Sequence, residues 1–196
     1  LEKIIRSAVQ PYQFAVGLSE GTGAATLLTT TALRSHEGSV MCAADLSNCF
    51  GEINVEDIPA LLREHGMDNV IPFFNAMYLR GTAVIKAGIA DGNTIYVKQQ
   101  RGVFQGDGLA VSIACLVVNK TIKDFLAKLP QETASRVTIG AIVDDITVVI
   151  HRRAETSAVL TAFKSTFEES SSVKLSPKTL VFSHKPITAV EAREYS

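Results

Sequence analysis

The spacing of hydrophobic residues along the chain switches between the two-residue period of strands and the 3.6-residue period of helices. Strand-type apolar runs lie at residues 39–45 and 137–150, and a strand pair is expected within 173–184. An alternating pattern around Asp-Gly-Asn predicts a β-hairpin over 82–100. Helical spacing covers the ranges 22–34, 54–66, 68–81, 109–129 and 154–171. The pattern therefore predicts helices and strands mixed along the whole chain.

The order of these elements favours an α+β fold, in which an antiparallel sheet has helices packed on one face. Asn54 is expected to cap the second helix, and Pro130 to end the long one. The start of the long helix is apolar on all sides, so we expect that part to be buried.

Two adjacent acids interrupt the apolar run "GAIVDDITVVI" at Asp144 and Asp145. In a continuous strand one of them would face the core, which is costly for an unpaired charge. We therefore expect the two acids to form the tight turn of a hairpin. A polar turn is the simplest interpretation. However, Asp-Asp lacks the glycine that such turns prefer, and a broken local rule often marks a functional site.

A third acid, Asp45, ends the apolar run 39–45. Taken alone, it would more often be a turn or cap residue. If its strand pairs with the hairpin, three carboxylates meet at one end of the sheet, where each like-charge pair at ~4 Å costs about 4 kcal/mol at an effective dielectric near 20. Mg²⁺ prefers such oxygen ligands, and two metal ions can promote phosphoryl transfer. The acids therefore predict a two-metal site.

Composition adds limits to this picture. The chain has 196 residues, with 46% hydrophobic and 20% charged residues, which suits one globular domain. Its net charge of -1 is low for a protein that grips nucleic acid unaided. The three cysteines have no metal-ligand spacing, so buried thiols are expected. The start, "LEKIIRSAVQ", has no apolar signal core and no Met, and we expect the chain to be part of a longer one.

Four motifs in order resemble those of reverse transcriptases, and one further segment resembles non-LTR retrotransposon enzymes. "DLSNCF" is similar to the first palm motif and "RGVFQGDGLAVSIACLVVN" to the Gln-Gly-Asp motif with its helix. "IVDDITVV" resembles the paired-Asp motif, "VKLSPKTLVF" the Lys-bearing motif, and "QFAVGLSEGTGAATLL" the segment upstream in non-LTR enzymes. The resemblance implies a polymerase palm with a ferredoxin- or RRM-like core at 39–196, preceded at 1–38 by a partial fingers or connecting helical segment.

The resemblance also implies roles for individual residues. Asp45 and Asp144 are expected to hold two Mg²⁺ ions, for which Mn²⁺ can substitute, and Asp145 to assist them. Lys178 is expected to approach the pyrophosphate as a proton donor, although an exposed turn lysine is an equal reading. The remaining expected contacts, to the triphosphate, the sugar and the templating base pair, are assigned to Leu46, Phe50, Gln105 and Gly106.

The expected activity is RNA-directed DNA polymerisation on an RNA template, with a DNA primer and dNTPs. The fingers and thumb of a longer chain are expected as further partners, no membrane is expected, and the resemblance implies an intracellular, nuclear location. Without fingers and thumb we expect negligible activity. Two alternatives stay open: a non-catalytic scaffold in an RNA–protein assembly, and an RNA-dependent RNA polymerase palm. In the latter, small polar residues usually stand where this chain has Phe50.

Overall fold

The computed structural model describes residues 2–79, 84–88, 94–98, 101–170 and 173–195, without the side chains of residue 2 and of the two segments between 84 and 98. The helical segments are α1 (Glu2–Val9), α2 (Gly21–Ser35), α3 (Cys49–Glu52), α4 (Ile58–Glu64), η1 (Asp68–Val70), α5 (Ile71–Phe74), η2 (Asn75–Leu79), α6 (Ala110–Lys128), α7 (Gln131–Ala134), η3 (Arg153–Glu155), α8 (Thr156–Ser170) and α9 (Ala189–Tyr195). The strands are β1 (Val40–Asp45), β2 (Val84–Gly88), β3 (Thr94–Lys98), β4 (Val137–Ile142), β5 (Asp145–Ile150) and β6 (Leu180–Ser183).

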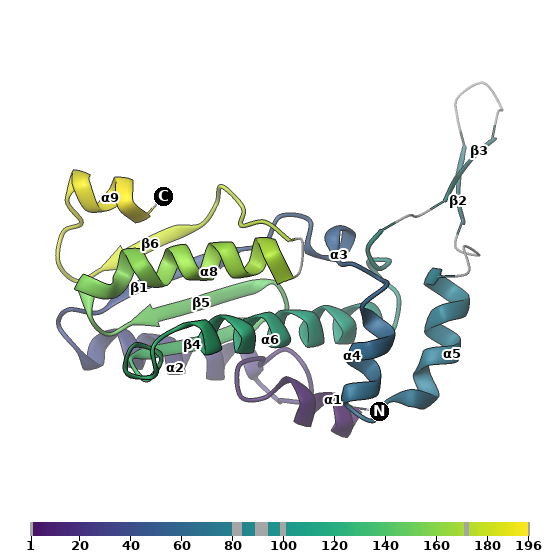
Figure 1. Cartoon of the computed structure of the whole chain (residues 1–196), viewed down its shortest axis with the longest axis horizontal. Helices are drawn as coiled ribbons and strands as arrows, with labels where there is room; N and C mark the ends of the chain where they lie inside the picture. The colour runs from purple at the N-terminus through teal and green to yellow at the C-terminus, as the bar shows by residue number, and fades with distance from the viewer. Residues whose placement is uncertain (1, 80–83, 89–93, 99–100, 171–172, 196) are drawn as a thin grey trace.

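Four strands form one antiparallel sheet in the order β4-β5-β1-β6, shown in Figure 1. The strands alternate as a sheet with a covered face requires: Val40, Cys42 and Ala44 of β1 are buried, and the residues between them are half-buried. The prediction of an α+β fold built on an antiparallel sheet is confirmed.

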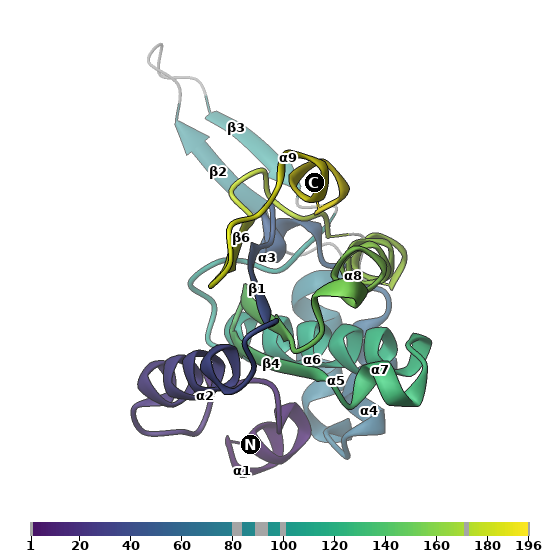
Figure 2. The same cartoon turned by 90° about the vertical axis from the view of Figure 1, so that its left-hand side faces the viewer.

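Helices α6 and α8 cover one face of the sheet. In α8, Val159, Phe163 and Phe167 recur at four-residue spacing and are fully buried, and the ring of Phe163 meets that of Phe125 of α6 edge-on at 5.3 Å between centroids. Helix α2 lies on the opposite side of the sheet, over β4 and β5 (Figure 2). There Gly140 leaves room for Thr29 of α2, whose methyl carbon would lie 3.1 Å from an added Cβ. Both faces of the sheet thus carry helices, whereas helices were expected on one face only.

Helix α6 joins two hydrophobic cores. Its first half, including Ile113 and Leu116, packs with α1, α4 and α5. Its second half, including Ile122 and Phe125, packs with the sheet and α8. The prediction that the start of this helix is buried is confirmed, since Ala110 and Ala114 are fully buried.

Three predicted features differ in the structure. The second helix begins at Ile58, directly after Asp57, so Asn54 does not cap it, and the Asn54 amide donates to the Asp57 carboxylate instead. The expected helix over 68–81 is divided into η1, α5 and the π-helical turn η2, within the part of this range that is described. The expected strand pair within 173–184 is wrong. Only β6 forms there, and it pairs with β1, while Leu175 makes a single bridge to Leu46. The strand β1, which is distant in the sequence, replaced the expected local partner. One edge of β1 pairs with β5, and its other edge was open to β6.

The hairpin of β2 and β3 projects away from the sheet and its helices, as Figures 1 and 2 both show. Its strands pair as predicted, and its turn lies outside the described residues. No helix in the described part of the chain is long and apolar enough to cross a membrane. The predicted boundary between residues 38 and 39 stays a prediction.

Candidate active site

The three acids meet at one end of the four-stranded sheet, which we call the acid end. Asp45 is the last residue of β1 and Asp145 the first of β5, and their Cα atoms are direct partners in the antiparallel register. Asp144 precedes Asp145 in the turn that joins β4 and β5. The predicted convergence of two distant segments therefore follows from strand pairing alone.

The turn itself differs from the prediction by one residue. Val143 and Asp144 form it, whereas Asp145 already belongs to β5 and pairs with Ile142. We call Val143 and Asp144 the acid turn. This register pairs Ala141 with Ile146, which are both buried in the core beneath α6 and α8. A shift of one residue would turn both side chains away from that core, so burial decided the register.

Burial and the neighbouring carboxylates both disfavour the charged form of one side chain at the acid end. Asp144 is half-buried, and burial raises the pKa of its carboxyl above the ordinary value; the neighbouring Asp145 and Asp45 raise the pKa further. A hydrogen bond from its own backbone N–H opposes this shift. Asp145 is exposed and Asp45 half-buried. The acid end thus makes ionisation of Asp144 less favourable than in a free side chain, and a positive charge brought to it would offset this cost.

The floor beneath Asp144 contains two thiols. Burial raises the pKa of Cys49 and of Cys115 to about 12 each, and the charge of Asp144 contributes to both shifts. All three cysteines are free and buried, as expected. A buried protonated thiol behaves as a small apolar group, so the two cysteines add no charge of their own near Asp144.

A cation site of oxygen ligands fits the chemistry of these acids, which are hard carboxylate donors on neighbouring backbone positions. Among the described residues, however, no group of three or more His, Cys, Asp or Glu side chains is gathered closely enough to hold a metal ion. The three carboxylates lie as neighbours rather than as a closed cluster. Their roles as metal ligands stay a prediction.

A third chain segment adjoins the first acid. The backbone N–H of Ser176 donates to the carbonyl oxygen of Asp45 at 2.7 Å, and that of Ser47 donates to the carbonyl of Lys174 at 2.8 Å. Lys178, at the end of this segment, is exposed, and its backbone N–H donates to the Ser176 hydroxyl. Within the described residues, no ion pair joins its ammonium to the three acids. Its predicted role in catalysis stays open.

Leu46 and Phe50 lie just beyond β1. Leu46 is buried, so only its backbone is suited to the contact predicted for it. Phe50 is half-buried and packs against the core of α1, α4 and α5. Its carbonyl oxygen accepts a hydrogen bond from Val103 at 2.7 Å, which ties this turn to the Gln-Gly-Asp motif. Core packing and a contact with the sugar both remain compatible with Phe50.

The Gln-Gly-Asp motif forms a loop over residues 102–107, which we call the QGD loop. Gln105 and Gly106 are exposed, and Gly106 has a φ of 97° that favours glycine. Sequence reasoning assigned no role to Tyr78, yet its hydroxyl donates to the Asp107 carboxylate at 2.5 Å and accepts from the backbone N–H of Phe104 at 3.2 Å. Tyr78 thus holds both ends of the exposed pair. No spacing in the sequence relates the two segments.

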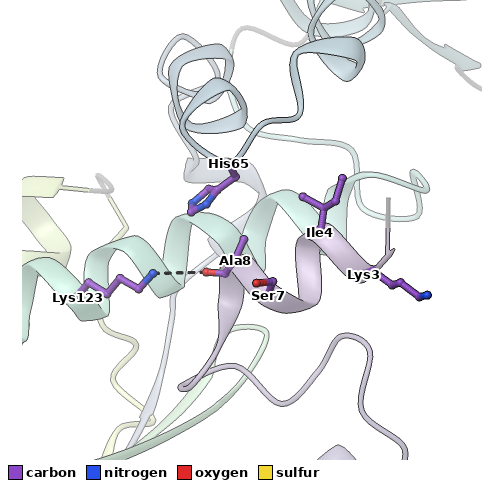
Figure 3. Close-up of a pocket in the computed structure, with 6 residues that line it drawn as sticks. All are labelled: Lys3, Ile4, Ser7, Ala8, His65 and Lys123. Atoms are coloured by element: carbon purple, nitrogen blue, oxygen red, sulfur yellow. Dashed lines mark hydrogen bonds between the residues drawn. The ribbon is translucent and has the colours of Figure 1, made fainter.

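A surface hollow of about 510 Å³ lies between α1, α6 and the end of α4 (Figure 3). Its lining includes Lys3, His65 and Lys123, and the ammonium of Lys123 reaches the carbonyl of Ala8 at 3.5 Å. None of the residues predicted for the site lines it. The acid end and this hollow are separate features of the chain.

A family model described as "Reverse transcriptase (RNA-dependent DNA polymerase)" matches residues 1–190. The chain belongs to the reverse transcriptase family. This confirms the family-level resemblance and supports a nucleotidyltransferase-type enzyme family. None of the curated proteins compared with the chain matches it.

Solved structures with the same fold include two telomerases. Apo telomerase from Candida tropicalis superimposes with a TM-score of 0.72 at 10% identity, over 93% of this reverse transcriptase chain and 36% of the telomerase. Telomerase from Candida albicans, solved with a TWJ fragment of telomeric RNA, gives 0.71 at 14% identity, over 93% and 34%. The chain therefore spans about a third of the length of these proteins, and at such identities the likeness shows the fold.

Proposed function

We propose that the chain is the palm of an RNA-directed DNA polymerase of the non-LTR retrotransposon type, acting with an RNA template, a DNA primer and dNTPs. One observation carries the proposal. In a member of the reverse transcriptase family, strand pairing places Asp45 opposite Asp145, and Asp144 stands in the adjoining turn. Burial and the charges of Asp145 and Asp45 raise the pKa of Asp144, and a bound cation would relieve the repulsion between these carboxylates, which supports the proposal.

In the proposed reaction the primer 3′-hydroxyl attacks the α-phosphorus of a dNTP, the bond to the pyrophosphate oxygen breaks, and the hydroxyl proton is released. Asp45 and Asp144 hold two divalent cations, Mg²⁺ or Mn²⁺, and Asp145 adds negative charge beside them. Cations held there would supply electrostatic stabilisation of the negative charge that develops in phosphoryl transfer. Lys178 donates a proton to the departing pyrophosphate.

The other residues position the nucleotide in this proposal. The Leu46 backbone lies along the triphosphate, and the Phe50 ring lies under the deoxyribose and excludes a 2′-hydroxyl. Gln105 and Gly106 contact the templating base pair and the incoming nucleotide. The half-buried ring of Phe50 supports its contact with the sugar, and the exposure of Gln105 and Gly106 supports their contacts with the nucleotide.

RNA as the template is supported by the family and by the Candida albicans neighbour, which was solved with a telomeric RNA fragment. The net charge of -1 supports a further part of the proposal, that the grip on the nucleic-acid backbone comes from fingers and thumb regions outside this chain. Nuclear residence belongs to the same proposal.

The first test is a titration of thermal stability with Mn²⁺ and Mg²⁺. It compares the wild type with Asp45→Asn and Asp144→Asn, and uses Asp124→Asn as the matched control, because Asp124 pairs with Lys120 on an exposed face of α6. We expect metal to raise the melting temperature of the wild type and of the control, and to raise that of the two acid-end variants much less.

Equal responses in all four proteins would overturn the two-metal site and leave the non-catalytic scaffold as the better description. Primer extension by the longest available form of the protein then separates the polymerase classes. Extension with dNTPs and not with rNTPs is expected. Preference for rNTPs would favour the RNA-dependent RNA polymerase.

A further inference from the structure

One buried polar side chain connects the N-terminal part of the chain to the acid turn. Gln13 is 1% exposed. Its neighbours Tyr12 and Phe14 pair with the free edge of β4: the N–H of Ala141 donates to the Tyr12 carbonyl, and the N–H of Phe14 donates to the Ala141 carbonyl, both at 2.8 Å. The backbone on either side of Gln13 is thus fixed two residues from the acid turn.

The amide of Gln13 satisfies both backbone groups of Val143. The N–H of Val143 donates to Gln13 Oε1 at 3.0 Å, and Gln13 Nε2 donates to the Val143 carbonyl at 2.7 Å. These two groups belong to the peptide planes before and after Val143. Since the second plane leads directly into Asp144, the pair of hydrogen bonds determines where the acid side chain starts.

Val143 needs such support because its backbone is strained. Its φ is 55°, a left-handed conformation that a β-branched residue rarely adopts. Such conformations persist only where surrounding contacts hold them, and they gather at functional sites. Without the Gln13 amide, Val143 would gain by relaxing to a negative φ, and the next residue would move with it.

We propose that Gln13 is a positioning residue, which holds the acid turn in the conformation that presents Asp144 beside Asp45 and Asp145. The effect of Gln13 on metal binding rests on the proposed function. Its effect on the shape of the turn rests only on the contacts above.

A purely structural role would make Gln13 one more contact between the N-terminal segment and the rest of the chain. Asn119 offers the matched comparison. It is likewise an amide that is 1% exposed, and its Nδ2 donates to the Ala8 carbonyl at 2.9 Å, but within the described part of the chain its amide forms no hydrogen bond with the acid turn. Removing either amide loosens the N-terminal segment, whereas only the loss of Gln13 releases Val143.

The test uses five forms of the 196-residue chain: wild type, Gln13→Met, Asn119→Leu, Val143→Gly and the Gln13→Met/Val143→Gly double variant. Met keeps the length of Gln without its hydrogen bonds, and glycine adopts a positive φ without strain. The readouts are the backbone NMR shifts and amide exchange of residues 143–146, and Mn²⁺ affinity. If Gln13→Met does not fold, Gln13→Asn replaces it, because a shorter amide cannot reach Val143 in the same way.

We expect Gln13→Met to move the shifts of Asp144 and Asp145 and to speed exchange at Val143 by roughly tenfold or more, as losing a buried hydrogen bond implies. Mn²⁺ should bind several-fold more weakly. In the Val143→Gly background the same change should have a much smaller effect on both, because the turn no longer needs the clamp. Asn119→Leu should leave the turn shifts and the Mn²⁺ affinity near those of the wild type.

Two results would overturn the proposal: identical turn shifts for Gln13→Met and wild type, or an effect of Gln13→Met that is undiminished in the Val143→Gly background. A wild type that binds no Mn²⁺ would instead count against the proposed function. The NMR comparison would still decide the role of Gln13, so the two failures are distinguishable.

Discussion

The acid turn and the QGD loop solve the same backbone problem in opposite ways. Both contain residues with a positive φ within three positions of a predicted site residue. The QGD loop uses glycine, at Gly102 with φ 76° and at Gly106 with φ 97°. The acid turn uses Val143 with φ 55° and holds it with the Gln13 amide. One conformation is therefore intrinsic to its residue, and the other depends on a contact across the chain.

The difference has a reason in packing. A Cβ at Gly102 would lie 2.4 Å from the carbonyl oxygen of Phe50, so no side chain fits there. At Val143 the side chain is half-buried and packs against the core of α1, α4 and α5. The side chain of Val143 contributes to core packing, whereas no side chain fits at Gly102. Backbone strain therefore occurs at Val143, where packing compensates for it, and not at Gly102.

The largest effect is expected for Gly102→Ala, which combines a left-handed φ with a clash against backbone atoms. We expect a loss of about 3 kcal/mol in the free energy of unfolding. Gly106→Ala is the matched control, because it has a positive φ with nothing within 4 Å of the added Cβ. It should cost about 1 kcal/mol. Urea unfolding measures both, and equal losses would show that the clash at Gly102 is relieved by movement of the loop.

A second prediction concerns the charge in the acid turn. The folded pKa of Asp144 lies above its ordinary value of 3.8, so the fold favours the neutral carboxyl. The resulting stabilisation is complete below pH 3.8 and is lost as the pH rises through the folded pKa. In the presence of EDTA, the wild type should therefore lose stability relative to Asp144→Asn as the pH rises through the folded pKa of Asp144.

Melting temperatures of the two proteins across the acidic range check this prediction, with Asp124→Asn as the control for loss of a carboxylate elsewhere. A stability difference that stays constant with pH would mean that Asp144 is not destabilised by its neighbours. Addition of Mn²⁺ above that range should reverse the order of the two proteins if the proposed metal site exists.

The smallest effect compares Val143→Gly with Val143→Ala. Both variants lose the packed side chain, but only glycine removes the strain of the left-handed φ. The Val143→Gly variant should therefore have a free energy of unfolding about 1 kcal/mol higher than that of Val143→Ala. This is the reverse of the order that glycine and alanine show in ordinary helices and strands. Urea unfolding of the two variants provides the measurement. If alanine is as stable as glycine, Val143 is not strained.

The sequence predicted the acid end because strand periodicity and an interrupted apolar run are local signals. Asp45 ends one run, Asp144 and Asp145 break another, and an antiparallel sheet brings the two breaks together. The alternation around the hairpin at 82–100 and the long helix after the QGD loop were local in the same sense. Each was readable because the physical cause, burial of one face, repeats along a short stretch.

The sequence did not reveal the one-residue shift of the acid turn, the pairing of β6 with β1, or the roles of Tyr78 and Gln13. The turn depends on which side of β4 and β5 meets the core under α6 and α8. Tyr78 lies 29 residues from Asp107, and Gln13 lies 130 residues from Val143. No periodicity spans such distances.

The chain by itself thus determined its periodic elements and the two apolar runs that the acids end or interrupt. Only the tertiary structure decided which residue takes the left-handed turn and which amide holds it there. The physical reason is that burial patterns are properties of short segments, whereas a hydrogen bond to a strained peptide exists only after distant segments have packed together.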